Sequence, residues 1–206
     1  MNHLKLPGLI AVAAMALMAL LGPGTASATV LCKTATAGKA CGEGWKYSGT
    51  VKGSLASGTS AVMKTTSGEV VNTCTGGTAE ASASAGGATS TVTANTTSVS
   101  LTGCTNKITN LSTCEGEIHY ISETSNGTAT VKGCEMTSLS AVGSCVYSAG
   151  SGIDVGVIEE GSSGEAAKFS KVVNKVGGGA FCPSTIVVEA SVVRTAPEGT
   201  LGVAPS

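Results

Sequence analysis

Short runs of alternating apolar and polar residues, separated by turn residues, recur along most of the chain. A period of two is typical of strands that bury one face. The clearest run is Thr78–Ala85, where four alanines occupy one face and Thr, Glu and Ser occupy the other. The predicted strands are Tyr47–Leu55, Ala61–Thr65, Glu69–Thr73, Thr78–Ala85, Thr89–Ala94, Ser98–Thr102, Gly116–Ser122, Thr128–Met136, Ser144–Tyr147, Asp154–Glu159 and Thr185–Arg194.

Turn residues between these runs predict hairpins. Ser67-Gly68 and Gly86-Gly87 each separate two predicted strands, and Ser122–Gly127 separates two more. About a dozen strands at this spacing must cover a face or close on themselves. The sequence therefore predicts an all-β fold, an antiparallel β-sandwich or barrel-like structure of about a dozen short strands.

One segment, residues 163–176, fits two structures. Ser162–Glu165 resembles a capping box, and the apolar residues from Phe169 to Val176 fall at helical spacing before a run of glycines. The same residues alternate like a strand through Phe169, Lys171 and Val173. The local pattern favours a helix slightly, but tertiary context overrides propensity, so we predict a strand.

The N-terminus has the three parts of a secretory signal. Lys5 precedes an apolar run, Leu9–Leu21, and Ala26-Ser27-Ala28 forms an A-x-A cleavage site. The apolar run is too short to cross a bilayer as a helix. We expect cleavage near Ala28 and a single secreted β domain over residues 29–206, which is released or held at the cell surface without membrane insertion.

Composition indicates a weak core that needs covalent support. After residue 28 the chain has only six aromatic residues, so its core consists mainly of Val, Ala, Ile and Thr and buries less area per residue. Eight cysteines in an exported chain predict four disulfides. A metal site is the alternative, but there is no C-x-x-C pair and His119 is the one histidine after residue 28. We expect no metal and no cofactor.

The cysteine positions favour one pairing scheme. Cys32 and Cys41 close a short loop, and Cys114 and Cys134 flank a predicted hairpin, so that both arrive at its open end. The two longer closures, Cys74–Cys104 and Cys145–Cys182, then remain. Each such closure stabilises a fold by about 2–4 kcal/mol.

The distribution of charged residues argues against nucleic acids and anionic lipids as partners. Residues 29–206 carry 11 basic and 13 acidic side chains, without a cluster of Lys or Arg. Nucleic acids and anionic lipids both require clustered cations. We expect neither as a partner.

Several short segments have a recognisable order along the chain. They are Leu31-Cys32, Ser60–Thr66, Thr73–Gly76, Gly103–Thr105, Glu117–His119, Asn126–Thr128, Cys145–Tyr147 and Phe181–Pro183. Taken in order, these segments resemble a group of uncharacterised exported proteins of actinobacteria. The resemblance covers nearly the whole chain after residue 28 and implies an extracellular β-rich module without an established activity, so no functional residue is carried over. The group often has an aromatic residue shortly after the position of Pro183, where this chain has Thr185–Val188.

Two sets of residues could support catalysis. A Ser-His-Asp triad would need His119 and Asp154, the one histidine and one aspartate after residue 28, but no serine lies in a G-x-S-x-G elbow. A pair of carboxylates at suitable separation could hydrolyse glycosides. The glutamates near the predicted hairpin are Glu115, Glu117, Glu123 and Glu135. Solvated strand positions explain these residues better, so we predict no catalytic residues.

Two further features have simpler structural explanations. Gly150–Gly156 matches one copy of a glycine-aspartate calcium repeat, but such repeats bind calcium by stacking many copies. We expect a turn that enters a strand. Trp45 and Tyr47 could stack on a sugar, although packing is the more common role.

The sequence favours a secreted non-enzymatic module that binds a surface or envelope component or has a structural role there. The runner-up is an extracellular hydrolase that acts on polymers through His119, Asp154 or the glutamates. A third possibility is a small-ligand carrier with an apolar cavity between sheets.

Overall fold

The computed structural model describes residues 28–84, 86, 91–124, 126–140, 143–158, 161–162 and 166–206. Among these residues the structure is all-β, with a short 3-10 turn at Glu43–Trp45 and no α-helix. The predicted signal lies outside the described residues, apart from Ala28. The strands are β1 Thr29–Cys32, β2 Gly49–Leu55, β3 Ala61–Thr65, β4 Val70–Ala83, β5 Thr91–Cys104, β6 Lys107–Leu111, β7 Glu115–Tyr120, β8 Gly127–Lys132, β9 Glu135–Ser140, β10 Gly143–Ser148, β11 Ile153–Ile158, β12 Gly161–Ser162, β13 Ala166–Gly178, β14 Thr185–Ala196 and β15 Thr200–Pro205.

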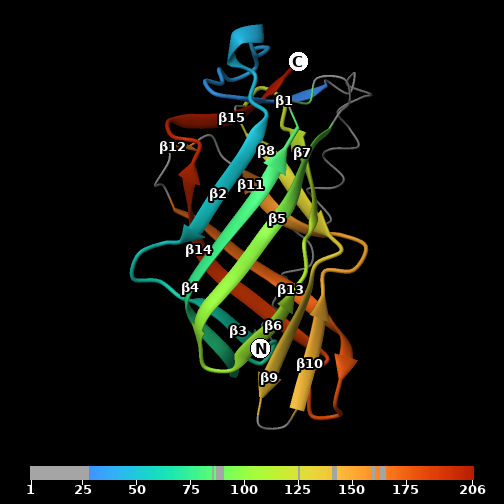
Figure 1. The fold of residues 1–206 in the computed structure, drawn as a ribbon. Helices are drawn as coiled ribbons and strands as arrows, with labels where there is room; N and C mark the ends of the chain where they lie inside the picture. Colours follow the sequence, from blue (N-terminus) through green and yellow to red (C-terminus); the bar gives the residue numbers. More distant parts are fainter. Residues whose placement is uncertain are drawn as a thin grey trace, which may run out of the picture.

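The strands form two antiparallel sheets. The large sheet has the order β11-β8-β7-β5-β4-β2-β14-β13-β10-β9-β6, and β3 also belongs to it by pairing with both β4 and β14. The small sheet has the order β1-β15-β12. In Figure 1, β2, β4 and β5 form one layer, and β13 and β14 run behind it at an angle. The predicted β-sandwich-like, antiparallel fold is confirmed.

Several strands are longer than the sequence predicts. β4 joins the predicted strands that begin at Glu69 and Thr78, and β5 joins Thr89–Ala94 to Ser98–Thr102. The prediction of one strand over Thr128–Met136 is wrong. Gly133 has a positive φ of 73°, which breaks the strand into β8 and β9.

The ambiguous C-terminal segment is a strand, as predicted, because β13 pairs with β14 from Ala166 to Asn174. Residues 163–165 of that prediction lie outside the described residues. Four strands had no predicted counterpart, namely β1, β6, β12 and β15.

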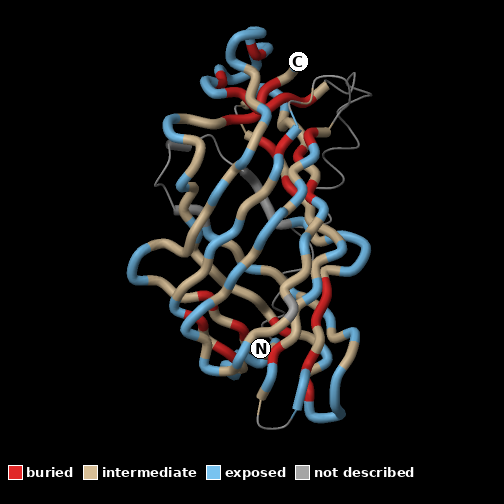
Figure 2. The backbone as a smooth tube through the Cα atoms, viewed as in Figure 1, coloured by how far each residue is buried: buried red, intermediate tan, exposed pale blue. Residues whose placement is uncertain are grey.

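The buried residues form two main cores at opposite ends of the molecule (Figure 2). The lower core lies between β3, β4, β10 and β14. Its buried members are Ala61, Met63, Cys74, Cys145, Tyr147, Cys182 and Ile186. The upper core lies beneath the small sheet. Its buried members are Leu31, Ala83, Val92, Ile118, Ala129 and Val203.

All eight cysteines are paired in the scheme that the sequence favours. Cys74–Cys104 and Cys145–Cys182 belong to the lower core, and Cys32–Cys41 fixes the loop after β1. Cys114–Cys134 joins the residues before β7 to those after β8. Four disulfides indicate an oxidising environment.

Candidate functional site

The β7–β8 hairpin carries most of the polar residues that the sequence analysis selected. Its turn is held by hydrogen bonds from the Ile121 amide to the Asn126 carbonyl (3.0 Å) and from the Thr124 hydroxyl to the Ile121 carbonyl (2.6 Å). The Cys114–Cys134 disulfide closes the opposite end. The hairpin is therefore fixed at both ends.

A close backbone contact joins this hairpin to β5. A Cβ atom at Gly116 would lie 2.4 Å from the Ala94 carbonyl oxygen, so only glycine permits the observed approach. At the hairpin's disulfide, the Thr96 amide donates to the carbonyl of Cys114 at 2.8 Å. These contacts bring β5 alongside β7.

Alternation gives the hairpin an apolar inner face and a polar outer face. Ile118 and Ala129 pack into the upper core, so their neighbours in the strands point outward. Glu117 pairs with Thr93 on one side and Thr130 on the other, and Thr130 pairs with Asp154 of β11. We name this surface the outer hairpin face. Its residues are Thr93, Glu115, Glu117, His119, Thr128, Thr130, Lys132 and Asp154.

Lys132 forms ion pairs with two glutamates on the outer hairpin face. Its ammonium lies 3.3 Å from a Glu117 carboxylate oxygen and 3.4 Å from one of Glu115. The hydrogen bonds to Glu117 and then Glu115, followed by their negative charges, raise the pKa of Lys132 above its ordinary value. The two carboxylates thus share one cation, which suits a charged recognition surface.

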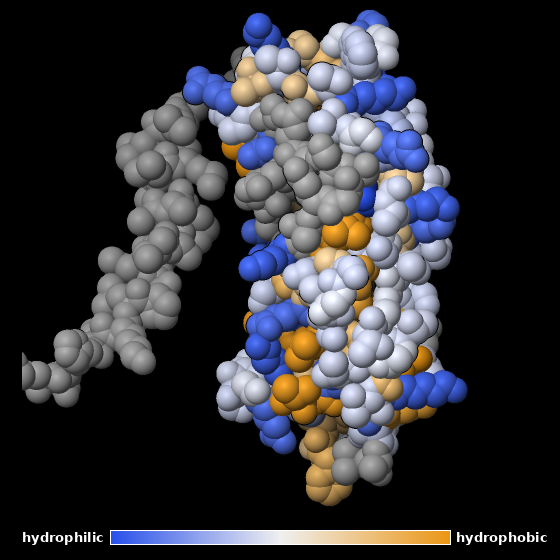
Figure 3. All heavy atoms as spheres, turned by 90° about the vertical axis from the view of Figure 1, so that its left-hand side faces the viewer, coloured by the Kyte–Doolittle hydropathy of each residue, from blue (hydrophilic) through white to orange (hydrophobic). Residues whose placement is uncertain are grey.

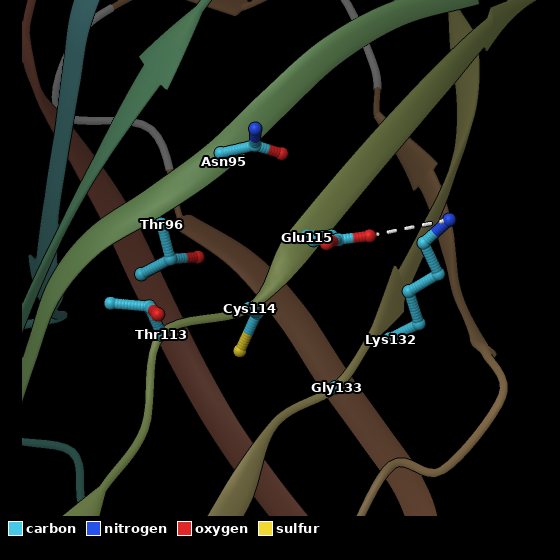
Figure 4. Close-up of a pocket in the computed structure, with 7 residues that line it drawn as sticks. All are labelled: Asn95, Thr96, Thr113, Cys114, Glu115, Lys132 and Gly133. Atoms are coloured by element: carbon cyan, nitrogen blue, oxygen red, sulfur yellow. Dashed lines mark ion pairs between the residues drawn. The ribbon is translucent and has the colours of Figure 1, made fainter.

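A hollow of about 430 Å³ lies beside this ion pair, lined by residues of β5 and of the open end of the β7–β8 hairpin (Figure 4). Glu115 points towards Lys132, and Asn95 and Thr113 add polar groups to the lining. The Cys114 sulfur belongs to the disulfide. The complete lining is Asn95, Thr96, Thr113, Cys114, Glu115, Lys132 and Gly133. These groups can hydrogen-bond a polar ligand at an open surface.

The structure does not assemble the possible Ser-His-Asp triad. His119 pairs with Thr128, whereas Asp154 pairs with Thr130, two residues further along β8. Two strand spacings and this offset separate their backbones by roughly 12 Å. Hydrogen bonding between the two side chains is therefore excluded in this arrangement.

The four glutamates are only partly gathered. Glu115 and Glu117 lie together on β7, but Glu123 occupies the turn at the far end of the hairpin, with a positive φ of 61°. Glu135 begins β9, where its amide donates to the Ser112 hydroxyl at 2.6 Å. The four glutamates do not form one site, because the hairpin separates residues at its turn from those at its open end.

The glycine-rich turn before β11 and the aromatic pair Trp45 and Tyr47 lie outside the β7–β8 hairpin. Residues 149–152 form a turn into β11, with Gly150 at a positive φ of 59°, as predicted. Trp45 is 56% exposed, and the Tyr47 hydroxyl donates to the Thr50 carbonyl. Of these two aromatic residues, Trp45 is the one whose ring is available on the surface.

Sequence reasoning missed Lys132, the cation that joins Glu115 and Glu117. The signal was available in the hairpin itself, because pairing strands about Ser122–Gly127 places Lys132 opposite Glu115. Cross-strand pairs of opposite charge are a common feature of such faces.

The described residues contain no group of three or more His, Cys, Asp or Glu side chains arranged to hold a metal ion. In the same part of the chain, no helix has the length and apolar character needed to span a membrane. Comparisons of this chain with protein-family models, curated proteins and solved structures give no match.

Proposed function

We propose that this protein is a secreted, non-enzymatic module that binds a surface or envelope component through the outer hairpin face. The observation that supports this proposal is the Glu115–Lys132–Glu117 ion-pair group on a hairpin fixed at both ends. A fixed surface loses little conformational entropy when it binds, so modest polar contacts give useful affinity. Opposite charges side by side also favour a partner with a complementary pattern.

The test is binding of the labelled protein, lacking residues 1–28, to intact cells of the producing organism, measured by co-sedimentation. Reversal of the surface charges in a Glu115→Lys, Glu117→Lys variant should weaken binding by about tenfold, since two complementary contacts become repulsive. The matched control reverses another exposed cross-strand pair, Lys52–Glu80, on β2 and β4. The proposal is wrong if the parent does not bind, or if the control weakens binding as much as the hairpin variant.

The second candidate is an extracellular hydrolase, for which Glu115 and Glu117 are the carboxylates that lie together. The shared Lys132 weighs against this role, because both carboxylates already form ion pairs with its ammonium. Assays on a panel of polysaccharides and peptidoglycan separate the two functions. Activity in the parent that disappears in Glu117→Gln, His119→Ala or Asp154→Ala would establish the hydrolase.

A further inference from the structure

Apolar side chains line the interior between the two cores without packing against either core. Gly77 faces inward, because a Cβ atom at this position would contact Leu55 and Leu101. Both leucines pack against the lower core. Because side chains alternate between the two faces of a strand, every second residue of β4 from Gly77 to Ala83 faces inward, and so do their partners on β5. Ala83 belongs to the upper core. The apolar residues between the two cores are Ala79, Ala81 and Val99, and within the described residues none packs against a buried cluster.

The opposite layer presents larger side chains to the same space. Val173 and Ala190 pack against the lower core, and the register of β13 with β14 places Phe169 opposite Ala190. Phe169 and Val192 therefore also face inward, and neither belongs to the packing of a core. We name the set Ala79, Ala81, Val99, Phe169 and Val192 the mid-section.

The mid-section is accessible although it faces inward. Ala79 is exposed, and Val192 is 38% exposed. The adjacent inward position on β2 is Gly53, which has no side chain to cover Ala79. Figure 3 shows apolar atoms reaching the surface part-way along the molecule. Exposed apolar side chains between two sheet layers offer a surface on which an apolar ligand can bury area.

A cation adjoins this apolar lining. Lys171 lies on the inner side of β13, two residues from Phe169 and opposite Val188 of the lower core. Its side chain is partly buried and makes no ion pair or hydrogen bond among the described residues. By contrast, Lys175 on the same side of the strand donates to the Gly179 and Cys182 carbonyls. Lys171 is thus a cation without an anion beside an apolar surface.

We propose that the mid-section binds a single-chain carboxylic acid, with the acyl chain against the mid-section residues and the carboxylate against Lys171. Burial of an acyl chain gains about 0.8 kcal/mol per methylene group. The ammonium adds a charge-assisted contact that selects an acid over a neutral ester. This proposal concerns the interior and does not depend on the outer hairpin face.

The probe is cis-parinaric acid, whose fluorescence rises in apolar surroundings, with its methyl ester for comparison. We expect the parent to bind the acid more tightly than the ester. Lys171→Met should weaken acid binding by about tenfold and leave ester binding unchanged. Lys168→Met is the matched control, because Lys168 is exposed on the outer side of the same strand, and it should bind like the parent.

Blocking the interior provides a second measurement. Val192→Phe should abolish binding of both probes, whereas Val193→Phe, with its side chain on the other face of β14, should not. Each variant is compared with the parent by circular dichroism, and Ala79→Phe with its outward control Thr78→Phe repeats the test on β4. Absence of parent binding, equal affinity for acid and ester, or binding that survives both blocking variants would refute the proposal. Loss of cell binding alone would leave it standing and affect only the outer hairpin face.

Discussion

The lower core contains the large buried side chains Tyr147, Met63 and Ile186 together with two disulfides. The upper core has no cysteine among its six buried members, and Leu31 and Val203 come from β1 and β15 of the small sheet. A Thr29 hydroxyl also accepts a hydrogen bond from the Tyr120 amide, which fastens β1 to the hairpin. The lower core thus contains two disulfides, whereas the upper core contains none and packs strands from distant parts of the chain, with the Cys32–Cys41 disulfide beside it.

This difference shows how a chain with few aromatic residues can fold. Small side chains gain little hydrophobic free energy each, so additional constraints decide the net stability. Restricting the unfolded chain with disulfides is one such constraint, and burying paired strand backbone is another.

Removing one disulfide from each end gives the largest expected effect. Cys145→Ala with Cys182→Ala opens a closure with a sequence separation of 37, whereas Cys32→Ala with Cys41→Ala opens one of only 9. Chain entropy predicts losses of about 4 and about 2.5 kcal/mol of unfolding free energy, respectively. Urea denaturation measures both variants. Equal losses would show that loop length does not govern stability here.

Truncating one buried aliphatic residue in each core is the next test. Ile186→Ala in the lower core should cost about 3 kcal/mol, because the cavity persists among cross-linked strands. Val203→Ala in the upper core should cost about 2 kcal/mol, since fewer methyl groups are lost and the small sheet can adjust. Thermal unfolding of both variants checks the order, and a greater loss for Val203→Ala would reverse the comparison.

The fold class could be predicted from local patterns, but the pairing of distant strands could not. Thr78 to Ala83 has the predicted two faces, and the four cysteine pairs match those that the hairpin and loop patterns favour. β1 and β15 were missed because each is short and depends on a partner at the other end of the sequence. Predicted strands that merge into β4 show that a sheet extends a strand through residues with weak local preference.

The acidic residues and the histidine of the candidate site were predicted, but Lys132 and the geometry were not. The separation of His119 from Asp154 depends on the register of β11 with β8, which includes an irregularity after Asp154. The mid-section also escaped prediction, because alternation identifies two faces without telling which one is inward.

The lower core contains one unsatisfied polar atom among the described residues, the hydroxyl of Tyr147. Tyr147 is 1% exposed, and its buried hydroxyl has no hydrogen-bond partner among the described residues. Tyr147→Phe should therefore leave stability unchanged or raise it by about 1 kcal/mol, because an unsatisfied group is removed.

The pH dependence of this variant provides a second test. Burial raises the pKa of Tyr147 above its ordinary value of 10.0. Above pH 10.0 the unfolded tyrosine loses its proton first, so the parent loses stability as the pH rises through the folded pKa. Denaturation of Tyr147→Phe should show a smaller alkaline loss. Parallel curves for parent and variant would contradict this expectation.

The smallest destabilising effect is expected on the surface of the upper half. Lys132→Met removes two exposed ion pairs, so it should lower the urea midpoint less than any destabilising change above. Because the pKa of Lys132 is raised, its contribution is present below the ordinary value of 10.5 and is lost as the pH rises through the folded pKa. High salt should reduce the difference between parent and variant. A difference that is independent of salt would indicate that packing of the lysine stem is responsible.

The pairing of β1 with β15 also determines the order of events during folding. The ribosome produces Thr29–Cys32 well before its hydrogen-bonding partner Gly202–Pro205, so this ladder cannot form until β15 has been made. Contacts with such large sequence separation form slowly. In the interval, β1 is an unpaired edge that another chain can occupy, which makes newly made copies of this protein prone to join one another.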